Sequence, residues 1–464
     1  MPHAKLQDLY VQVLEKIKPS EREVESELAF ANALLDQIRK TKGPHIHTVL
    51  AGSLARNTHL KNDRDIDLFV LYPKNLERSA FEKEGLQLGK KIFAKNKYEI
   101  AYSEHPYVRG IIQGYEVEIV PSYHVENANE LKSAVDRSPL HVQYLLGALN
   151  SKKCDEVRLF KQFLKGINAY GADTKFNSLP GYATELLIIH YGSFNALLEG
   201  MRAWRMQECI DIKNHYKNPG EALKKFNAPL VIVDPTDANR NVAAALSFNQ
   251  YCRMIAAAHA FMKKPSKAFF FGKKEKPWPL RRVQNALNTK ELIALQLQYP
   301  KNVLPDIVWG QTRRMGKKIR TALEQNDFRP VRNAEWTDEK KMIVLLFELE
   351  SLELEKTRIR KGPFVTDPAS TQRFLNAHKK PLGGPRIEEG RWVIETPRAH
   401  THARTFMEHY LPALKATEKP EMKKALQHAR ILDEPALQRL YKKSKAFQPF
   451  FTHYLDGKEK FLEY

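Results

Sequence analysis

Two amphipathic helices are predicted over residues 5–40. Pro19 and Ser20 separate them, and Ser20 followed by Glu23 has the spacing of a capping box at a helix start. Behind this start, apolar residues recur every three or four positions, at Leu28, Ala31, Leu34, Leu35 and Ile38. That spacing puts them on one helix face, which we expect to pack on a core.

Three strand candidates follow these helices. They cover His45–Ala51, Ile66–Tyr72 and Tyr115–Pro121. In the third, Val117 and Ile119 share one face, because successive side chains of a strand point to opposite sides.

The middle of the chain is predicted to be helical. Apolar residues recur at helical spacing at Val157, Phe160, Phe163, Leu164 and Ile167. Residues 184–194 form a further helix with an apolar body. The stretch 234–242 is rich in turn formers, and we predict that it leads into a helix from Val242, capped by Asn241 or Asp237.

The C-terminal half mixes helices and strands. A basic helix is predicted over 311–324, and strands over 328–333, 342–352 and 391–396. Prolines at 265, 277 and 279 indicate a domain boundary. We therefore expect an α+β multidomain protein with three parts: 1–150, a helical central part 151–262, and an α+β part 263–464.

The charge of the chain adds a partner to this picture. The 464 residues carry a formal net charge of +21, and the pI is about 9.6. Such an excess favours a polyanionic partner, although it does not by itself separate nucleic acid from an anionic membrane surface. No apolar run approaches the roughly 20 residues that span a bilayer, and the first residues lack the apolar segment of a signal peptide. We expect a cytoplasmic protein with no membrane partner.

Residues 262–282 combine basic and aromatic side chains. The segment contains eight basic residues and one acid, with Phe269, Phe270, Phe271 and Trp278 between them. This composition is typical of a nucleic-acid surface or of a basic linker. We expect its lysines to contact RNA phosphates and its phenylalanines to pack inside the protein.

Isolated histidines and cysteines give no metal site. His45 and His47 share one face of the first strand candidate, but no third ligand lies near them. Cys154, Cys209 and Cys252 are far apart, without the Cys-x-x-Cys spacing of a zinc site. We interpret all five as ordinary structural positions.

A pair of aspartates is the strongest candidate for chemistry. If 66–72 is a strand, Asp65 and Asp67 project side by side from its start. Paired carboxylates suit Mg²⁺, which prefers carboxylates and substrate phosphate oxygens. Taken alone, Asp-x-Asp is usually a solvated turn, but Gly52 and Ser53 precede this one by about a dozen residues. A glycine there allows close approach of a ligand, and a helix start near Ser53 offers free N–H groups to phosphates.

A third acidic ligand has two candidates. Glu116 and Glu118 share the face of the third strand opposite to its apolar face. A two-metal site draws on several carboxylates, and the pattern alone allows either glutamate to complete it.

Taken together, these motifs resemble the polymerase-β-like nucleotidyltransferase superfamily. More narrowly, the chain is similar to the archaeal-type (class I) CCA-adding enzymes, which are tRNA nucleotidyltransferases. The similarity rests on GSLARNT, DRDIDLFVLYP, EIVPSYHV, SPLHVQYL, RLFKQFLKGINAYGAD, LPGYATELLIIHYGSF, DPTDANRNVAAALS, WGQTRRMGKKIRTALEQNDFRPVRNAEW and GPRIEEGRWVIETPR. It implies a nucleotidyltransferase head at 1–150, a nucleotide-binding neck at 151–262, and a tRNA-binding body and tail at 263–464.

The resemblance also assigns the metal ligands. Asp65 and Asp67 match the first two metal carboxylates of the family. The third falls three residues before Pro121, which selects Glu118 over Glu116. The family pattern has aspartate there, so this chain keeps the charge and adds a methylene.

A second group of residues matches the nucleotide-binding positions of the family. These are Ser53, Arg56, His141, Lys161, Tyr170 and Arg240. The resemblance places the first five at the incoming triphosphate, where Lys161 would neutralise the departing pyrophosphate. It places Arg240 at the edge of the incoming base, where it helps to select C or A.

The predicted function is the template-independent addition of C, C and A to the 3′ end of tRNA. CTP and ATP are the expected nucleotides, Mg²⁺ the cofactor and the tRNA acceptor end the partner, and the family allows a homodimer. Two alternatives remain open: a poly(A)- or oligoadenylate-type polymerase, and a non-catalytic RNA-binding protein on the same scaffold.

Overall fold

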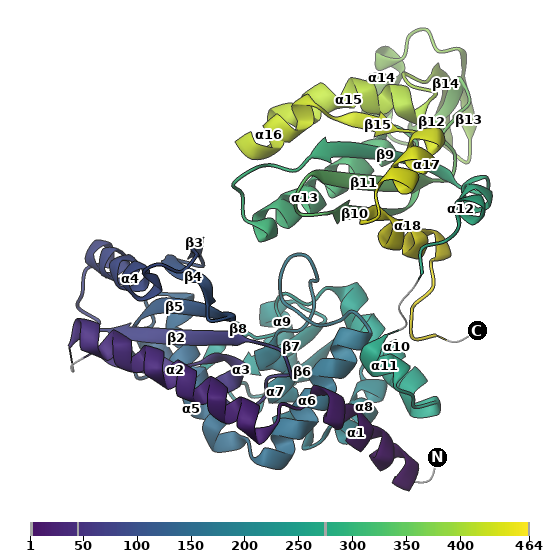
Figure 1. Ribbon diagram of the computed structural model, residues 1–464. Coiled ribbons are helices and arrows are strands. Elements are labelled where there is room, and N and C mark those ends of the chain that lie inside the picture. Colours follow the sequence, from purple (N-terminus) through teal and green to yellow (C-terminus); the bar gives the residue numbers. More distant parts are fainter. Residues whose placement is uncertain (1–2, 44–45, 273–275, 463–464) are drawn as a thin grey trace. The chain divides into compact units, whose positions relative to one another are not determined.

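The computed structural model describes residues 3–43, 46–272 and 276–462 (Figure 1). The chain forms two compact units. Unit 1 comprises Met1–Lys273 and Glu459–Tyr464, and unit 2 comprises Lys274–Lys458. His45, at the start of the first strand candidate, lies outside the described residues.

Unit 1 begins with two helices and a five-stranded sheet. The helices are α1 (His3–Ile17), α2 (Glu21–Lys42), α3 (Gly52–Ala55), α4 (Arg78–Phe93), the 3-10 turns η1 (Ala128–Glu130) and η2 (Ala134–Asp136), and α5 (Arg137–Ala148). The strands are β1 (His47–Leu50), β2 (Asp65–Tyr72), β3 (Tyr98–Tyr102), β4 (Pro106–Ile112) and β5 (Tyr115–Tyr123). Their order is β1-β2-β5-β4-β3, and only β2 and β5 among these neighbours run parallel. The predicted capping box at Ser20 is present, because its side chain accepts from the Glu23 N–H.

Helices α2 and α4 cover the apolar face of this sheet. Ile66 and Leu68 of β2 are buried together with Leu35 of α2 and Leu88 of α4. The opposite face of β2 presents Asp65 and Asp67 at the start of the strand. Further along the same face, Phe69 and Leu71 are buried in a second, smaller core with Val120 and Val142, so only the start of β2 is left for polar chemistry.

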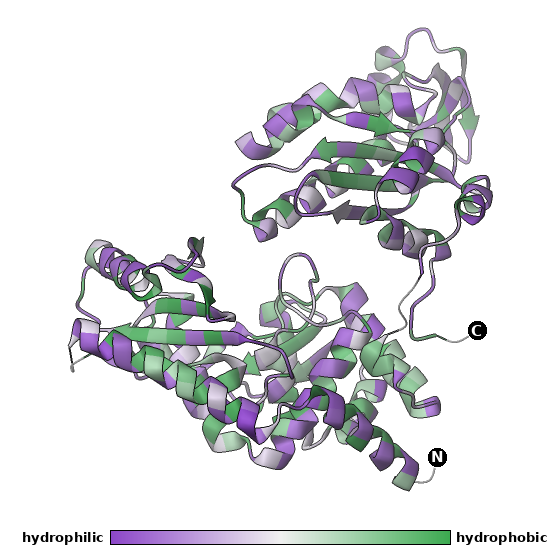
Figure 2. Cartoon of the chain, in the orientation of Figure 1, coloured by the Kyte–Doolittle hydropathy of each residue, from purple (hydrophilic) through white to green (hydrophobic). Residues whose placement is uncertain are grey.

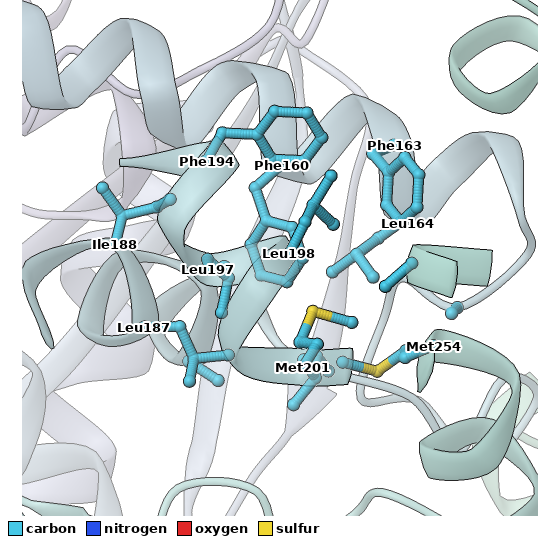
Figure 3. Packing of buried hydrophobic residues seen from close by; sticks show 14 of the residues in the cluster. Phe160, Phe163, Leu164, Leu187, Ile188, Phe194, Leu197, Leu198, Met201 and Met254 are labelled. Carbon is cyan, nitrogen blue, oxygen red and sulfur yellow. The ribbon is translucent and has the colours of Figure 1, made fainter. Parts of the chain in front are cut away.

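The rest of unit 1 is mainly helical. It contains α6 (Ser151–Gly166), α7 (Gly181–Tyr191), α8 (Phe194–Ala203), β6 (Glu208–Ile210), α9 (Pro219–Phe226), β7 (Leu230–Asp234), β8 (Asp237–Asn241), α10 (Phe248–Lys263) and α11 (Ala268–Phe271). The predicted helical spacing from Val157 onward is confirmed. Figure 3 shows Phe160 and Phe163 of α6 packed with Phe194 and Leu197 of α8, all of them fully buried.

The prediction for residues 234–242 is wrong. These residues form the β7–β8 hairpin, and helix α10 starts at Phe248, capped by Ser247. Asn241 accepts from the Ile232 N–H at 2.9 Å and donates to the Leu230 carbonyl at 3.0 Å. Its side chain therefore bonds the neighbouring strand instead of capping a helix.

Unit 2 contains two antiparallel sheets. One has the order β10-β11-β9-β15, formed by β9 (Glu291–Gln298), β10 (Pro330–Thr337), β11 (Met342–Leu349) and β15 (Arg430–Leu432). The other has the order β12-β14-β13, formed by β12 (Thr357–Phe364), β13 (Gly383–Glu388) and β14 (Arg391–Pro397). The helices are α12 (Leu280–Leu287), α13 (Pro305–Gln325), α14 (Pro368–Ala377), α15 (Ala403–Thr417), α16 (Pro420–Gln427), α17 (Glu434–Lys443) and α18 (Phe447–Asp456).

The four-stranded sheet of unit 2 is buried on both faces. Ile343 and Leu345 of β11 pack in a core with α13, α15 and α16, while Val344 and Leu346 pack in a second core with α12, α17 and α18. Strands β9 and β11 are accordingly coloured mostly hydrophobic in Figure 2. A strand buried on both faces reads as an unbroken apolar run, which explains the continuous pattern of MIVLLFEL.

The chain returns to unit 1 at its C-terminal end. Glu459 forms two 2.8 Å hydrogen bonds with Arg253 of α10. Phe461 is buried in the helical core of unit 1 and stacks on Phe269. Phe269 and Phe270 are both buried, as predicted, whereas Phe271 is exposed.

Within the described residues, none of the helices has the combination of length and apolar character that a membrane crossing requires.

Candidate active site

Four carboxylates lie on one face of the β2–β5 pair. The parallel register aligns Asp65 with Glu116 and Asp67 with Glu118. Residues in register across neighbouring strands point to the same face, so all four side chains lie on the face opposite to the core. Asp67 and Glu118 are half-buried, whereas Asp65 and Glu116 are exposed.

Gly52 allows Asp67 to lie against the backbone. A Cβ atom at Gly52 would be 1.9 Å from Asp67 Oδ2, a distance that atoms cannot adopt, and its φ of +68° is in the left-handed region. The Ala51 N–H also donates to the Asp67 carbonyl at 2.8 Å. The Gly-Ser turn therefore leaves the space in which the Asp67 side chain packs.

Burial raises the pKa of three of these carboxylates, and neighbouring acids add to the rise in two of them. The pKa of Asp65 is raised to about 6, mainly by loss of water and secondly by the charge of Glu116. The pKa of Glu118 is raised to about 7, again mainly by loss of water and secondly by the charge of Asp67. Loss of water also raises the pKa of Asp67, although Arg56 opposes this. Negative charge is thus concentrated here without full compensation, a condition that a bound cation relieves.

The residues present fit a hard divalent cation by their chemistry. Asp65, Asp67 and Glu118 supply the oxygen donors that such ions prefer. Among the His, Cys, Asp and Glu residues within the described ranges, no three are already clustered as ligands around one point. The fit therefore rests on the shared face and on the raised pKa values. Glu118 meets both conditions, and its closeness to Asp67 favours it over Glu116 as the third acid.

Arg56 and Lys161 meet at a buried glutamate. Arg56 Nε lies 3.0 and 3.1 Å from the two oxygens of Glu185, which α7 holds completely buried. Lys161 Nζ donates to the Thr58 carbonyl and hydroxyl, both at 3.1 Å, and lies 3.7 Å from Glu185 Oε1. The Thr58 hydroxyl also donates to Glu185. Two cations thus share one acid, which leaves net positive charge for an anionic ligand.

Burial tunes the charge of this cluster. It lowers the pKa of Lys161 to about 8, and Glu185 acts in the opposite direction. The charges of Arg56 and Lys161 lower the pKa of Glu185 despite its burial. Lys161 and Glu185 therefore carry opposite charges at neutral pH.

Tyr170 and Ser53 border the same cluster. A Cβ atom at Gly181, the first residue of α7, would lie 3.1 Å from the Tyr170 hydroxyl and 3.8 Å from Lys161 Cε. Both side chains therefore converge on the start of α7, where a glycine leaves room for them. The Ser53 carbonyl accepts from the Thr58 N–H at 2.9 Å, which fixes the loop that carries Arg56.

A second cluster is centred on Asp234 at the end of β7. This buried carboxylate lies 2.8 Å from His141 Nε2 and accepts from Arg240 Nη1 at 2.7 Å. It also accepts from the Tyr182 hydroxyl at 3.2 Å. Tyr182 stacks on the His141 ring at 4.0 Å. One acid thus orients the two candidate nucleotide contacts, His141 and Arg240.

Arg56 connects the two clusters to the carboxylates electrostatically. Its charge opposes the rise in the pKa of Asp67, and it adds to the burial that lowers the pKa of His141. All nine residues singled out from the sequence lie in unit 1. Acidic side chains that suit a cation and basic side chains that suit a polyanion are thus both present in unit 1.

Sequence reasoning missed four polar residues of this site: Thr58, Tyr182, Glu185 and Asp234. Two of them had a signal. Glu185 is the one acid in the apolar helix sequence GYATELLIIHY, and Asp234 ends the apolar strand LVIVD. A charged residue in a buried segment requires a partner, so both could have been selected as members of a site.

Comparison with known proteins covers most of the chain. Three family models match: "Nucleotidyltransferase domain" over residues 34–141, "tRNA nucleotidyltransferase, second domain" over 155–271, and "CCA-adding enzyme, C-terminal domain" over 288–433.

Relatives that match over most of their length agree with these family models. A protein named CCA-adding enzyme from Methanocaldococcus jannaschii is 37% identical over 408 residues, covering 86% of this chain and 89% of the relative. Proteins of the same name from Methanoregula boonei and Archaeoglobus fulgidus are 37% and 35% identical, covering 84% of this chain and 83% and 85% of the relatives. Among solved structures, the Cid1 poly(U) polymerase matches with a TM-score of 0.47 and 14% identity, over 58% of this chain and 99% of that chain.

Proposed function

The chain belongs to the family of CCA-adding enzymes, and from this premise we propose how its own residues add C, C and A to the 3′ end of tRNA without a template. The matches extend through the nucleotidyltransferase domain, the second domain and the C-terminal domain. We infer that CTP and ATP are the substrates and that pyrophosphate is released.

Asp65, Asp67 and Glu118 are the proposed ligands of the metal, which we take to be Mg²⁺. When bound, the ion would lower the pKa of the attacking 3′-hydroxyl and stabilise charge at the α-phosphate. The contribution of the protein is to hold three acids on one face of the β2–β5 pair, with Gly52 giving Asp67 its place.

Arg56, Lys161, Tyr170, Ser53 and His141 form the proposed triphosphate site. Arg56 and Lys161 supply the positive charge; Glu185 holds both in position and favours the protonated form of Lys161. Groups oriented before the substrate arrives need little reorganisation as charge develops on the leaving pyrophosphate. The hydroxyl of Tyr170 is available as a neutral donor beside them.

Arg240 is the proposed contact with the edge of the base. Asp234 fixes its Nη1 nitrogen at 2.7 Å, and the remaining nitrogens of the guanidinium are free to donate. The same carboxylate orients His141, so the base contact and the phosphate contact share one support.

The C-terminal unit is the proposed grip on the tRNA acceptor end. The net charge of +21 supports backbone contacts, so tRNA affinity is expected to fall steeply with salt. We further propose a cytoplasmic homodimer, which light scattering of the purified protein would test.

One observation carries this proposal: the paired acids of β2 and β5 beside the Arg56–Glu185–Lys161 cluster. The test supplies tRNA that ends before CCA together with labelled CTP, ATP and Mg²⁺. Three added nucleotides in the order C, C, A are expected. An A tail longer than one residue would identify a poly(A)-type polymerase instead, and no incorporation would leave an RNA-binding protein.

The Asp67→Ala variant is the matched control for chemistry. It should abolish incorporation while tRNA binding stays close to that of the wild type, because in this proposal the acid binds the metal ion and not the RNA backbone. Persisting activity would show that the metal ligands have been assigned incorrectly.

A further inference from the structure

Arg109 lies between two acids on the face of the sheet that carries the metal ligands. The antiparallel registers align it with Glu99 of β3 on one side and with Glu118 of β5 on the other. Glu118 is in turn aligned with Asp67 of β2. Because in-register side chains share a face, one row of charged side chains crosses the sheet. It runs from the acid Glu99 through the base Arg109 to two neighbouring acids, Glu118 and Asp67.

Arg109 bonds the outer acid of this row. Its Nε and Nη2 atoms lie 2.7 and 2.6 Å from Glu99 Oε1. Among the described residues, the one hydrogen-bond partner of Glu118 is the Tyr107 hydroxyl at 3.4 Å. The guanidinium therefore acts on Glu118 through space, where its charge opposes the rise of the Glu118 pKa.

The space around Arg109 allows a different arrangement. A cavity of about 420 Å³ is lined by Glu99, Arg109, Glu116 and Glu118, together with Lys97 and Ile111. The Arg109 and Glu99 side chains are 40% and 57% exposed, so the pair is solvated and individually weak. Without Glu99, the guanidinium has an open path to Glu118.

We propose that Glu99 is a positioning residue for the third carboxylate: by retaining Arg109, it keeps Glu118 available to a divalent cation. An arginine paired with Glu118 would occupy the oxygens that the cation needs, since guanidinium and carboxylate form strong two-point contacts. This inference rests on the proposed metal site and adds to it the residue that keeps a competing internal cation away.

The test measures Mn²⁺ binding to the full-length protein without RNA, by isothermal titration. Glu99→Gln should weaken binding by about fivefold, the upper end for an exposed ion pair. In the Arg109→Ala background the same substitution should have no effect, because the competing guanidinium is gone. The metal concentration for half-maximal incorporation should change in parallel.

The control and the double variant separate this role from simple charge. Asp36→Asn removes an exposed acid that pairs with Arg39 elsewhere in unit 1, and it should leave Mn²⁺ binding unchanged. Wild-type affinity in Glu99→Gln would overturn the proposal. So would a fivefold loss that persists in Arg109→Ala, which would indicate only the removal of a negative charge.

Failure of the proposed function would look different. If Asp67→Ala binds Mn²⁺ as tightly as the wild type, the metal site itself is wrong. If Asp67→Ala loses binding and Glu99→Gln keeps it, only the role of Glu99 is refuted. Circular dichroism of each variant would verify that these partly exposed substitutions preserve the fold.

Discussion

Glu185→Gln is the substitution that most directly tests the nucleotide site. It keeps the shape of the side chain and removes its charge. Arg56 is then left with a neutral partner at about 3 Å, and Lys161 loses the acid at 3.7 Å that supports its protonation. Both cations are largely buried, so water cannot replace the lost charge.

The expected loss of stability is about 3 kcal/mol. Removing one partner of a buried ion pair typically costs 3–5 kcal/mol, because the other charge remains without compensation. The lower end applies here, since the pKa of Lys161 is already about 8 and falls further without Glu185, so the amine can release its proton. Urea unfolding followed by tryptophan fluorescence at pH 7.5 would measure the change.

A matched control exists on the next helix. Glu199 pairs with Arg202 on the surface of α8, and its side chain is 48% exposed. Glu199→Gln should change the free energy of unfolding by less than about 1 kcal/mol. CTP binding should weaken in Glu185→Gln and stay unchanged in the control. A Glu185→Gln protein as stable as the wild type would refute the argument that this acid holds the two cations.

Four further predictions concern individual side chains. CTP affinity should fall as pH rises through about 8, where Lys161 loses its proton, and isothermal titration of Lys161→Met should show no such slope. Burial lowers the pKa of His59 to about 4, so on acidification the unfolded state binds a proton before the folded state does. The free energy of unfolding should therefore fall as the pH drops from about 6.5 to 4. Urea unfolding of His59→Asn should show a weaker pH dependence. Glu118→Asp should raise incorporation if the extra methylene displaces the metal. Tyr107→Phe should weaken Mn²⁺ binding when residue 118 is glutamate, because the Tyr107 hydroxyl bonds that carboxylate. In the Glu118→Asp background the same substitution should have no effect, because aspartate is too short to reach the hydroxyl.

The local patterns were sufficient for the elements that carry the acids. Alternation at Asp65–Asp67 predicted a strand with two carboxylates on one face, and the parallel register of β2 and β5 agrees with it. The glutamate of α7 and the aspartate of β7 were not selected, because each has a partner far away in sequence: Arg56 lies 129 residues from Glu185, and His141 lies 93 residues from Asp234. Helical spacing marks a face as buried, but it does not identify a distant cation that shares that burial.

The prediction for residues 234–242 was wrong for a related reason. Turn formers followed by an apolar run are compatible with a helix start or with a second strand. The strand is favoured by Asn241, whose side-chain amide hydrogen-bonds the backbone of β7 across the hairpin. That contact exists only once the neighbouring strand is in place, so no local pattern contains it.

The return of the C-terminal segment has a consequence for how the protein is made. Phe461 belongs to the core formed by α6, α8 and α10, although more than 180 residues of unit 2 separate it from α11. Domains emerging from the ribosome generally fold in order from the N-terminus. Unit 1 cannot complete its core in that order, because the last aromatic side chain arrives only after unit 2 has been synthesised. Unit 2 is therefore a genuine insertion, and a chain cut at residue 273 would keep every proposed contact with the nucleotide while leaving a gap beside Phe269.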